Sequence, residues 1–282
     1  MARLFGTDGV RGIANVELTC EMAYRLGQTA AIYLGKTIVV GRDTRRSGDM
    51  LGAALSAGIM SAGGTVLEAG IIPTPGVALL VREMRAAGGA VISASHNPPE
   101  YNGIKFFDAQ GFKLPDAVED EIEAFIVNGG LEGEVAAAEE AAWSAAQAAA
   151  PDAPADATSY LASEIKMPAG AEVGVVIPLE NACDIYIDHA ARSIEEQGIS
   201  FKGLRIALDT GHGASSLTSP EALRRLGAEV SVINDDFDGM DINVRCGSTH
   251  LEPLRALMAE TGADVGIAHD GAAARVMLTA PD

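Results

Sequence analysis

Short apolar runs alternate with single helix-length segments along the chain, and this alternation constrains the fold more than any other feature. In the first part, apolar runs at 37–40, 65–70 and 90–95 are separated by helical patterns at 49–64 and 76–89. Strands joined by one crossover helix can lie parallel, and such crossovers are right-handed. The order predicts an α/β sheet whose functional groups lie on loops beyond the carboxyl ends of its strands.

The residues that flank these segments predict where the helices begin and end. Thr19 is expected to cap a helix over 20–35, which Gly35 closes. Ser47 is expected to cap the next helix, and Pro75 suits the first turn of the third.

The alternation returns in the second part of the chain, after residue 183. A helical pattern at 184–198 is followed by a strand pattern at 204–209, a helix at 220–227, a strand at 229–233 and a last strand pattern at 264–269. The sequence therefore predicts two consecutive α/β/α layered domains with mixed, mostly parallel sheets.

An Ala-rich stretch at 128–159 interrupts the pattern, and its "PDAPAD" run is typical of a linker. We expect residues 1–150 to form the first domain, residues 151–183 a linker or irregular insertion, and residues 184–282 the second domain. Trp143, the only tryptophan, is expected to be a packing anchor.

Net charge limits the partners of the chain. With 39 acidic and 20 basic residues, the formal charge of −19 repels nucleic acid and anionic membranes, so any anionic ligand must meet locally clustered cations. The three cysteines are far apart, which favours reduced thiols and a cytoplasmic location. No run approaches the ~20 apolar residues that a membrane-spanning helix needs, so we expect neither a membrane partner nor a nucleic-acid partner.

Several loops flanked by glycine carry basic residues, as a phosphate site would require. They are Arg11 in "FGTDGVRG", Arg42, Arg45 and Arg46 in "GRDTRRSG", Lys105 in "NGIK" and Arg275 in "DGAAAR". These side chains could form a positive pocket in a negative protein. Alternatively, the arginines of the second loop could pair with nearby acids such as Asp43 and Asp49.

Ser95 follows an apolar strand pattern in "VISASHNPPEYNGIKFF". A serine at such a strand end lies where active-site groups of α/β sheets are found. On the residues alone, an ordinary turn in which the hydroxyl bonds to the backbone explains Ser95 equally well. His96 has the same two interpretations.

Four motifs together resemble the α-D-phosphohexomutase family: "FGTDGVRG", "GRDTRRSG", "ISASHNPPEYNGIKFF" and "CGSTH". The resemblance is close from residue 1 to about 125 and looser from about 184 to 280. It implies an isomerase that moves a phosphoryl group between a phosphoserine and a phosphorylated hexosamine or hexose. A sugar bisphosphate intermediate turns over in the site, so the net reaction interconverts the 6-phosphate and the 1-phosphate.

The resemblance also implies a role for each matching residue. Ser95 corresponds to the phosphate carrier, and Lys105 and Arg11 are expected to clamp the charge that develops on the phosphoryl oxygens. His96 and Asn97 are expected to hold the loop against the phosphate. Arg275, which matches the end of the family's metal loop, is expected to bind phosphate as well.

The metal loop departs from the family. Its pattern D-G-D-x-D-R implies Mg²⁺ held by three aspartates and the phosphoserine, but only Asp270 is kept, because Ala272 and Ala274 stand at the other two positions. Mg²⁺ wants oxygen ligands in octahedral geometry, and methyl groups supply none. We therefore expect Ser95 and Asp270 to form a weak metal site or none, with a loss of transfer rate.

Other motifs receive no chemistry. The acidic run "DDFDGMDIN" lacks the spacing of a calcium loop and is interpreted as a solvated turn. Cys246 and His250 in "CGSTH" are too few for a metal cluster. The loop "TGHGAS" differs from the family at Thr210, Gly211 and His212, so no site residue is assigned to it.

Two classes of function follow from the resemblance. One is the amino-terminal half of a phosphosugar mutase, without the further domains that in the family read the sugar and bind its second phosphate. The other is a non-catalytic phosphosugar-binding or regulatory relative, which could form a homodimer through its first domain. The choice of sugar stays open, and a phosphomannomutase or phosphoglucomutase specificity is an alternative.

Overall fold

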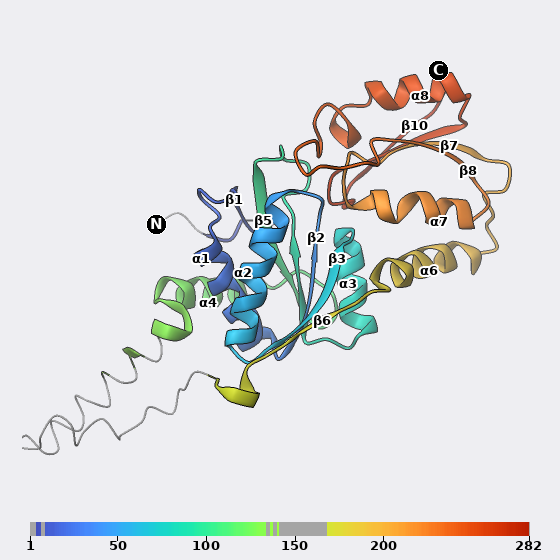
Figure 1. The fold of residues 1–282 in the computed structure, drawn as a ribbon. Coiled ribbons are helices and arrows are strands. Elements are labelled where there is room, and N and C mark those ends of the chain that lie inside the picture. The colour runs from blue at the N-terminus through green and yellow to red at the C-terminus, as the bar shows by residue number, and fades with distance from the viewer. Residues whose placement is uncertain (1–3, 7–8, 134–135, 138–139, 141–167, 282) are drawn as a thin grey trace, which may run out of the picture.

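The computed structural model describes residues 4–6, 9–133, 136, 137, 140 and 168–281. Two sheets organise them into two α/β units, which Figure 1 shows stacked along the molecule. The first sheet has six strands in the order β1-β5-β4-β2-β3-β6, and the second has four in the order β10-β9-β7-β8. The predicted fold class, two layered domains with mixed and mostly parallel sheets, is confirmed. Trp143 and the run at 151–156 lie outside the described residues.

The first unit is a six-stranded sheet between two layers of helices. Its strands are β1 (Val10–Ile13), β2 (Thr37–Arg42), β3 (Thr65–Ile71), β4 (Gly88–Ile92), β5 (Tyr101–Phe107) and β6 (Val176–Pro178). Its helices are α1 (Cys20–Thr29) with the π-helical turn η1 (Ala30–Leu34), α2 (Ser47–Ser61), α3 (Thr74–Glu83), α4 (Asp116–Val127) and α6 (Ala182–Glu195). Strand β2 runs parallel to β3 and β4, whereas β5 runs antiparallel to β4. The residues that join β4 to β5 therefore lie beyond the carboxyl end of the parallel strands.

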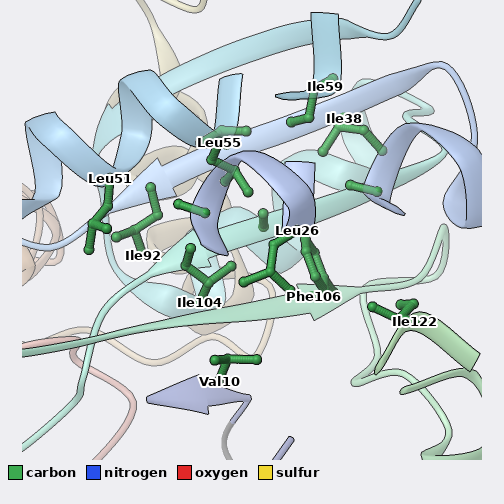
Figure 2. Close-up of a cluster of buried hydrophobic side chains, with 14 of the residues drawn as sticks. Val10, Leu26, Ile38, Leu51, Leu55, Ile59, Ile92, Ile104, Phe106 and Ile122 are labelled. Atoms are coloured by element: carbon green, nitrogen blue, oxygen red, sulfur yellow. The ribbon is translucent and has the colours of Figure 1, made fainter. Parts of the chain in front are cut away.

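Side chains of the central strand β2 alternate between two cores. Ile38 and Val40 pack with α1 and α2 in the larger core, where Leu26 and Leu55 are also fully buried (Figure 2). Val39 points to the opposite face and packs in the core below α3. This period of two places apolar side chains on both faces, as expected of a strand covered by helices on each side.

The expected helix caps have mixed outcomes. The Thr19 hydroxyl accepts a hydrogen bond from the backbone N–H of Met22 at 3.2 Å, which confirms the predicted cap. The expectation for Ser47 was wrong, because α2 begins at Ser47 and no side chain caps it. The Ser47 hydroxyl instead accepts a hydrogen bond from the Asn102 side chain at 2.9 Å, which ties α2 to β5.

The stretch expected to be a linker contributes to the first sheet. Within 151–183, the described residues include the 3₁₀ turn η3 (Gly170–Glu172) and β6, which runs parallel to β3 along the edge of the sheet. Three residues are too short for a strand to stand out by periodicity alone, so the sequence pattern gave no sign of β6.

The second unit is a smaller four-stranded sheet with helices on its two faces (Figure 1). Its elements are β7 (Arg205–Asp209), the 3₁₀ turn η4 (Ala214–Leu217), α7 (Ser219–Arg225), β8 (Glu229–Ile233), the 3₁₀ turn η5 (Gly247–Thr249), α8 (Glu252–Thr261), β9 (Val265–His269) and β10 (Val276–Thr279). Ala207 and Ala268 pack against Leu254 and Met258 of α8. No helix among the described residues is long and apolar enough to cross a membrane.

Candidate functional site

Ser95 lies on the loop between β4 and β5, three residues beyond the end of β4. Its side chain is largely buried, and its hydroxyl donates a hydrogen bond to the carboxylate of Asp270 in the second unit. Its backbone φ of 56° lies in the left-handed region, which costs a residue with a Cβ about 1–3 kcal/mol. A strained serine held against a buried carboxylate points to a role beyond an ordinary turn.

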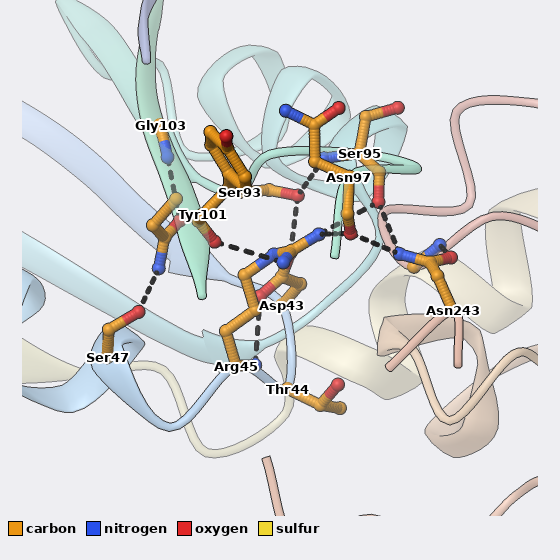
Figure 3. Close-up of polar contacts among 12 residues, drawn as sticks. Asp43, Thr44, Arg45, Ser47, Ser93, Ser95, Asn97, Tyr101, Gly103 and Asn243 are labelled. Atoms are coloured by element: carbon orange, nitrogen blue, oxygen red, sulfur yellow. Dashed lines mark hydrogen bonds and ion pairs between the residues drawn. The ribbon is translucent and has the colours of Figure 1, made fainter. Parts of the chain in front are cut away.

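Arg45 holds the backbone of this loop from below. Its guanidinium donates hydrogen bonds to the carbonyl oxygens of Ser95 at 3.2 Å, Asn97 at 2.7 Å and Tyr101 at 3.0 Å, and also to that of Pro98 (Figure 3). Arg45 is 1% exposed, so these bonds form away from water. The planar guanidinium with its several donors suits this task, which a lysine could not perform.

The charge of Arg45 is balanced by Asp43, which lies 3.0 Å from its Nε and is equally buried. The Asp43 carboxylate also accepts a hydrogen bond from the Ser93 hydroxyl at 2.5 Å, and the same hydroxyl accepts one from the backbone N–H of Ser95 at 3.0 Å. Burial raises the pKa of Asp43, while Arg45 and Ser93 oppose that shift. Arg45, Asp43 and Ser93 are thus linked in series, and they hold the backbone N–H of Ser95 as well as its carbonyl.

Asn243 supports the loop from the second unit. Its side-chain N–H₂ donates to the carbonyl oxygens of Ser95 at 2.9 Å and Asn97 at 3.1 Å, and its side-chain oxygen accepts from the N–H of Gly271 at 2.9 Å. One buried amide therefore links the Ser95 loop to the loop that carries Asp270.

The acidic run also makes contacts between the two units. The backbone N–H of Arg46 donates to the carbonyl of Gly239 at 3.1 Å. A neighbouring contact between the units lies outside the run, where the Thr44 hydroxyl donates to the carbonyl of His212 at 2.5 Å. Asp235, Asp236 and Asp238 are exposed, as a solvated turn requires, but Gly239 is buried against Arg46. The run is therefore both a solvated turn and a contact surface.

A cleft of about 240 Å³ opens beside Ser95. It is lined by Arg11, Thr74, Val91, Ser93, Ser95, Lys105, Ala272, Ala274 and Arg275. Three of the sequence-predicted cations, Arg11, Lys105 and Arg275, thus share one cleft with the predicted phosphate carrier. These cations come from β1, β5 and the loop before β10, which lie far apart in the sequence.

Packing positions two of these cations. Arg11 lies opposite Gly103 in the β1–β5 pairing, and a Cβ on Gly103 would come within 2.8 Å of the Arg11 side chain. Lys105 extends over the ring of Phe107, with its nitrogen 5.7 Å from the ring centre. The Lys105 ammonium is attracted to the face of this ring, and both Arg11 and Lys105 line the cleft.

The remaining predicted site residues, His96 and Asn97, are not among the residues that line the cleft. His96 lies on the Ser95 loop, and its Nδ1 accepts a hydrogen bond from the guanidinium of Arg275. Asn97 contributes its backbone carbonyl to Arg45 and Asn243. These two loop residues are therefore tied to their surroundings by hydrogen bonds.

Arg42 and Arg45 take the alternative left open by the sequence. Arg42 pairs with the exposed Asp49 at 2.5 Å, and Arg45 pairs with Asp43. Neither lines the cleft beside Ser95. The expected positive pocket is thus formed without them.

The loop 270–275 offers Mg²⁺ a poor set of donors. Asp270 is fully buried, and its Oδ1 accepts the N–H groups of Ala274 at 2.9 Å and Arg275 at 3.2 Å, while Oδ2 accepts the Ser95 hydroxyl. Ala272 and Ala274 contribute methyl groups to the cleft. Among the described residues, no group of three or more His, Cys, Asp or Glu side chains could hold a metal ion. The residues present do not fit the magnesium site that the resemblance implies.

Sequence reasoning missed two residues that hold the site. Asn243 lies inside a run interpreted only by its aspartates. The sequence placed Arg45 either at a phosphate or against an acid such as Asp43, and neither alternative included its bonds to the Ser95 loop. A signal for Asn243 existed, because an asparagine tolerates the left-handed backbone it adopts here, with φ of 61°. No local signal connects it to Ser95, because the contact spans 148 positions.

Family models and curated relatives match both α/β units of the chain. Residues 2–132 match the model of phosphoglucomutase/phosphomannomutase alpha/beta/alpha domain I, and residues 184–282 match that of domain II. The phosphoglucosamine mutases of Alkaliphilus metalliredigens and Carboxydothermus hydrogenoformans are 45% and 47% identical over 98% of this chain. The chain covers 55% and 56% of these two relatives, so it spans about half their length.

A solved structure shows the same fold. The phosphoglucomutase/phosphomannomutase family protein of Burkholderia thailandensis superposes with a TM-score of 0.73 at 23% identity, over 99% of this chain and 54% of that one. Two matching domain models together account for most of the chain. The chain belongs to the phosphoglucomutase/phosphomannomutase family and carries its domains I and II.

Proposed function

We propose that this chain binds a phosphorylated hexosamine and carries a phosphoryl group on Ser95, as the amino-terminal half of a phosphoglucosamine mutase would. The observation that carries the proposal is the position of the Ser95 hydroxyl in a cleft with Arg11, Lys105 and Arg275. The chain has an overall excess of acids, so three cations around one hydroxyl favour an anionic ligand at this place.

The proposed reaction is a phosphoryl transfer in two directions. The bond between phosphorus and the Ser95 oxygen breaks as a free hydroxyl of the sugar monophosphate takes the phosphoryl group. The proton of that hydroxyl passes to the Ser95 oxygen, which becomes a hydroxyl again. The bisphosphate then turns over and returns its other phosphate to the Ser95 oxygen. The net change interconverts glucosamine 6-phosphate and glucosamine 1-phosphate.

Each site residue has a part in this proposal. Arg11 and Lys105 neutralise the equatorial oxygens of the phosphoryl group, which carry most of the charge in such transition states. Arg275 adds a third cation and orients His96 through their hydrogen bond. Arg45 and Asn243 hold the Ser95 loop at the edge of the cleft.

A second candidate is a phosphosugar-binding relative that does not turn over. The observation that favours it is the loop 270–275, where two methyl groups replace expected carboxylates. Specificity for mannose or glucose phosphates is a third candidate, because the described cleft has few groups that could read a sugar ring.

Intact-mass spectrometry tests these candidates. The purified chain is incubated with glucosamine 1,6-bisphosphate, and the mutase proposal expects one added phosphoryl group, which peptide mapping assigns to Ser95. Ser95→Ala is expected to remain unmodified. Ser193→Ala is the matched control, because Ser193 is exposed on α6 and its hydroxyl donates to the Ala190 carbonyl of the same helix. Mannose and glucose bisphosphates, tested in parallel, rank the specificities.

An unmodified wild-type chain that still binds glucosamine 6-phosphate would favour the binding protein over the mutase. Phosphate on another residue, or equal labelling of Ser95→Ala, would contradict both the assigned carrier and the proposed reaction.

A further inference from the structure

The cleft beside Ser95 has an unusual balance of charge for a site whose resemblance implies a metal. Arg11, Lys105 and Arg275 line it, and Asp270 is the one carboxylate that touches Ser95 among the described residues. Three cations against one carboxylate leave an excess of two positive charges. A phosphate monoester carries about −1.5 to −2 at neutral pH, which this excess offsets without any added ion.

The loop 270–275 explains how this balance arises. Three aspartates with one Mg²⁺ would carry a net charge of about −1, as the family pattern implies. Here one carboxylate and two alanines occupy the same three positions, so these positions also carry a net charge of −1 with no metal bound. Removing two carboxylates has the same electrostatic effect as adding a divalent cation.

The contacts of Asp270 support the same conclusion. Its Oδ1 is occupied by two backbone N–H groups and its Oδ2 by the Ser95 hydroxyl. The N–H of Thr74 donates to the Ala272 carbonyl at 2.9 Å, and Asn243 holds Gly271. Protein hydrogen bonds therefore hold this loop in place, and they use both carboxylate oxygens of Asp270.

We propose that the cleft binds phosphate monoesters without a divalent metal, because the two alanines at 272 and 274 leave the charges of Arg11, Lys105 and Arg275 in excess over the one carboxylate of Asp270. The inference rests on the proposed function for the kind of ligand, and adds that the site is independent of metal. It concerns binding, so its test does not require turnover.

Isothermal titration calorimetry with inorganic phosphate as the probe provides the test. The full chain is titrated once in EDTA and once in excess Mg²⁺, and the two dissociation constants are expected to agree within about twofold. Arg11→Gln and Lys105→Gln are each expected to weaken binding about tenfold or more in EDTA, since each removes a charge-assisted contact. Arg82→Gln is the matched control, because Arg82 is exposed on α3 and lines a different cleft.

Variants that restore the missing carboxylates of the loop 270–275 test the same proposal in the opposite direction. Ala274→Asp is expected to weaken phosphate binding about tenfold in EDTA through like-charge repulsion. The further variant Ala272→Asp/Ala274→Asp is expected to recover affinity when Mg²⁺ is added. Ala272 is buried, so the single variant at the exposed position 274 keeps the test valid if the double variant does not fold.

Three results would overturn the proposal: phosphate binding by the wild-type chain only with Mg²⁺, binding unaffected by both Arg11→Gln and Lys105→Gln, or no binding in either buffer. Its failure is separate from that of the mutase proposal. If the chain bound phosphate in EDTA but was never phosphorylated on Ser95, metal-independent binding would be supported and the mutase proposal would be contradicted. A chain that becomes phosphorylated on Ser95 but binds inorganic phosphate only with Mg²⁺ would do the reverse.

Discussion

The side-chain nitrogen of Asn243 lies 2.9 Å from the carbonyl oxygen of Ser95 and connects the two domains at the candidate site. The same side chain accepts the N–H of Gly271, so it fixes the Ser95 loop and the Asp270 loop relative to each other. Arg45 contacts the Ser95 carbonyl from the other side. The strained backbone at Ser95 is thus held by donors from both domains.

Replacing Asn243 should release this loop. Asn243→Gly keeps the left-handed backbone accessible but removes the hydrogen bonds, each of which contributes about 0.5–1.5 kcal/mol. Backbone amide exchange at residues 93–97 is expected to become faster by about tenfold, as measured by hydrogen–deuterium exchange. Asn243→Asp should have a larger effect, because a carboxylate would face two carbonyl oxygens without a donor.

The control for this change is Asn234→Gly. Asn234 also has a left-handed backbone, and its side chain bonds to Asp209 within the second domain. Exchange at residues 93–97 should be unaffected by it. Equal acceleration in both variants would show that Asn243 acts through general stability and does not position the loop.

Arg45→Met should destabilise the first domain strongly. It leaves Asp43 buried without its cation, a change that costs about 3–5 kcal/mol in other proteins. Urea unfolding monitored by circular dichroism measures the free energy of unfolding. Asp43→Asn/Arg45→Met should recover part of the loss, since the unpaired charge is gone.

Arg42→Met is the comparison for Arg45. Its partner Asp49 is 79% exposed, and exposed ion pairs contribute about 0–1 kcal/mol. If both arginine variants lost the same free energy, burial of the Arg45 pair would not be the cause.

The sequence could predict the features of this structure that depend on residues close together in the chain, and it could not predict those that depend on distant ones. The alternation of β2, α2, β3, α3 and β4, and that of α6, β7, α7, β8 and β9, follows from local periodicity. The Thr19 cap follows from a local preference. The assignment of Ser95 came from a motif resemblance, since periodicity alone left an ordinary turn equally acceptable. The cap assigned to Ser47 failed because its hydroxyl bonds to Asn102, a residue on a distant strand.

The rest of the site depends on contacts that no local pattern encodes. Asn243 and Ser95 meet only because two separate sheets bring their loops together, and β6 joins the first sheet after a long excursion of the chain. The same limit applies to Arg45, whose burial decides that it supports the loop and does not bind phosphate. Local propensity determines elements, whereas tertiary packing determines which of their side chains meet.

Gly103→Ala should displace the Arg11 side chain that lines the cleft. A Cβ at this position would lie 2.7 Å from the Ser93 carbonyl oxygen and 2.8 Å from the Arg11 side chain. Such overpacking costs about 1–3 kcal/mol and would shift Arg11, so affinity for inorganic phosphate should fall together with the melting temperature. Calorimetric titration and thermal unfolding measure the two effects.

The matched control for Gly103→Ala is Gly52→Ala in α2. A Cβ on Gly52 would make only an ordinary contact with Ile92 at 3.5 Å, and alanine favours a helix over glycine by about 1 kcal/mol. This variant should be as stable as the wild type or more so. A Gly103→Ala chain with unchanged stability and phosphate affinity would show that the strands tolerate the extra methyl group.

Cys246 should make the protein less stable in alkali. Burial, together with the charges of Asp209 and Asp241, raises the pKa of its thiol from 9.0 to about 12. The folded state therefore keeps the proton longer than the unfolded state, and the stabilisation is fully present below pH 9.0 and is lost as pH rises towards 12. The free energy of unfolding should fall by up to about 1.4 kcal/mol per pH unit within that window.

Urea unfolding of the wild type and of Cys246→Ala at several pH values isolates this effect, because other groups that titrate in the same range contribute to both chains. The alanine variant should show a shallower decline above pH 9.0, since it lacks the thiol whose pKa is raised. Thiol labelling at pH 8 offers an independent measurement, in which Cys246 should react slowly until urea unfolds the chain, because the thiolate is the reactive form and the side chain is 2% exposed. Parallel pH profiles for the two chains, with fast labelling of native Cys246, would mean that this thiol is open to solvent and contributes nothing to the pH dependence.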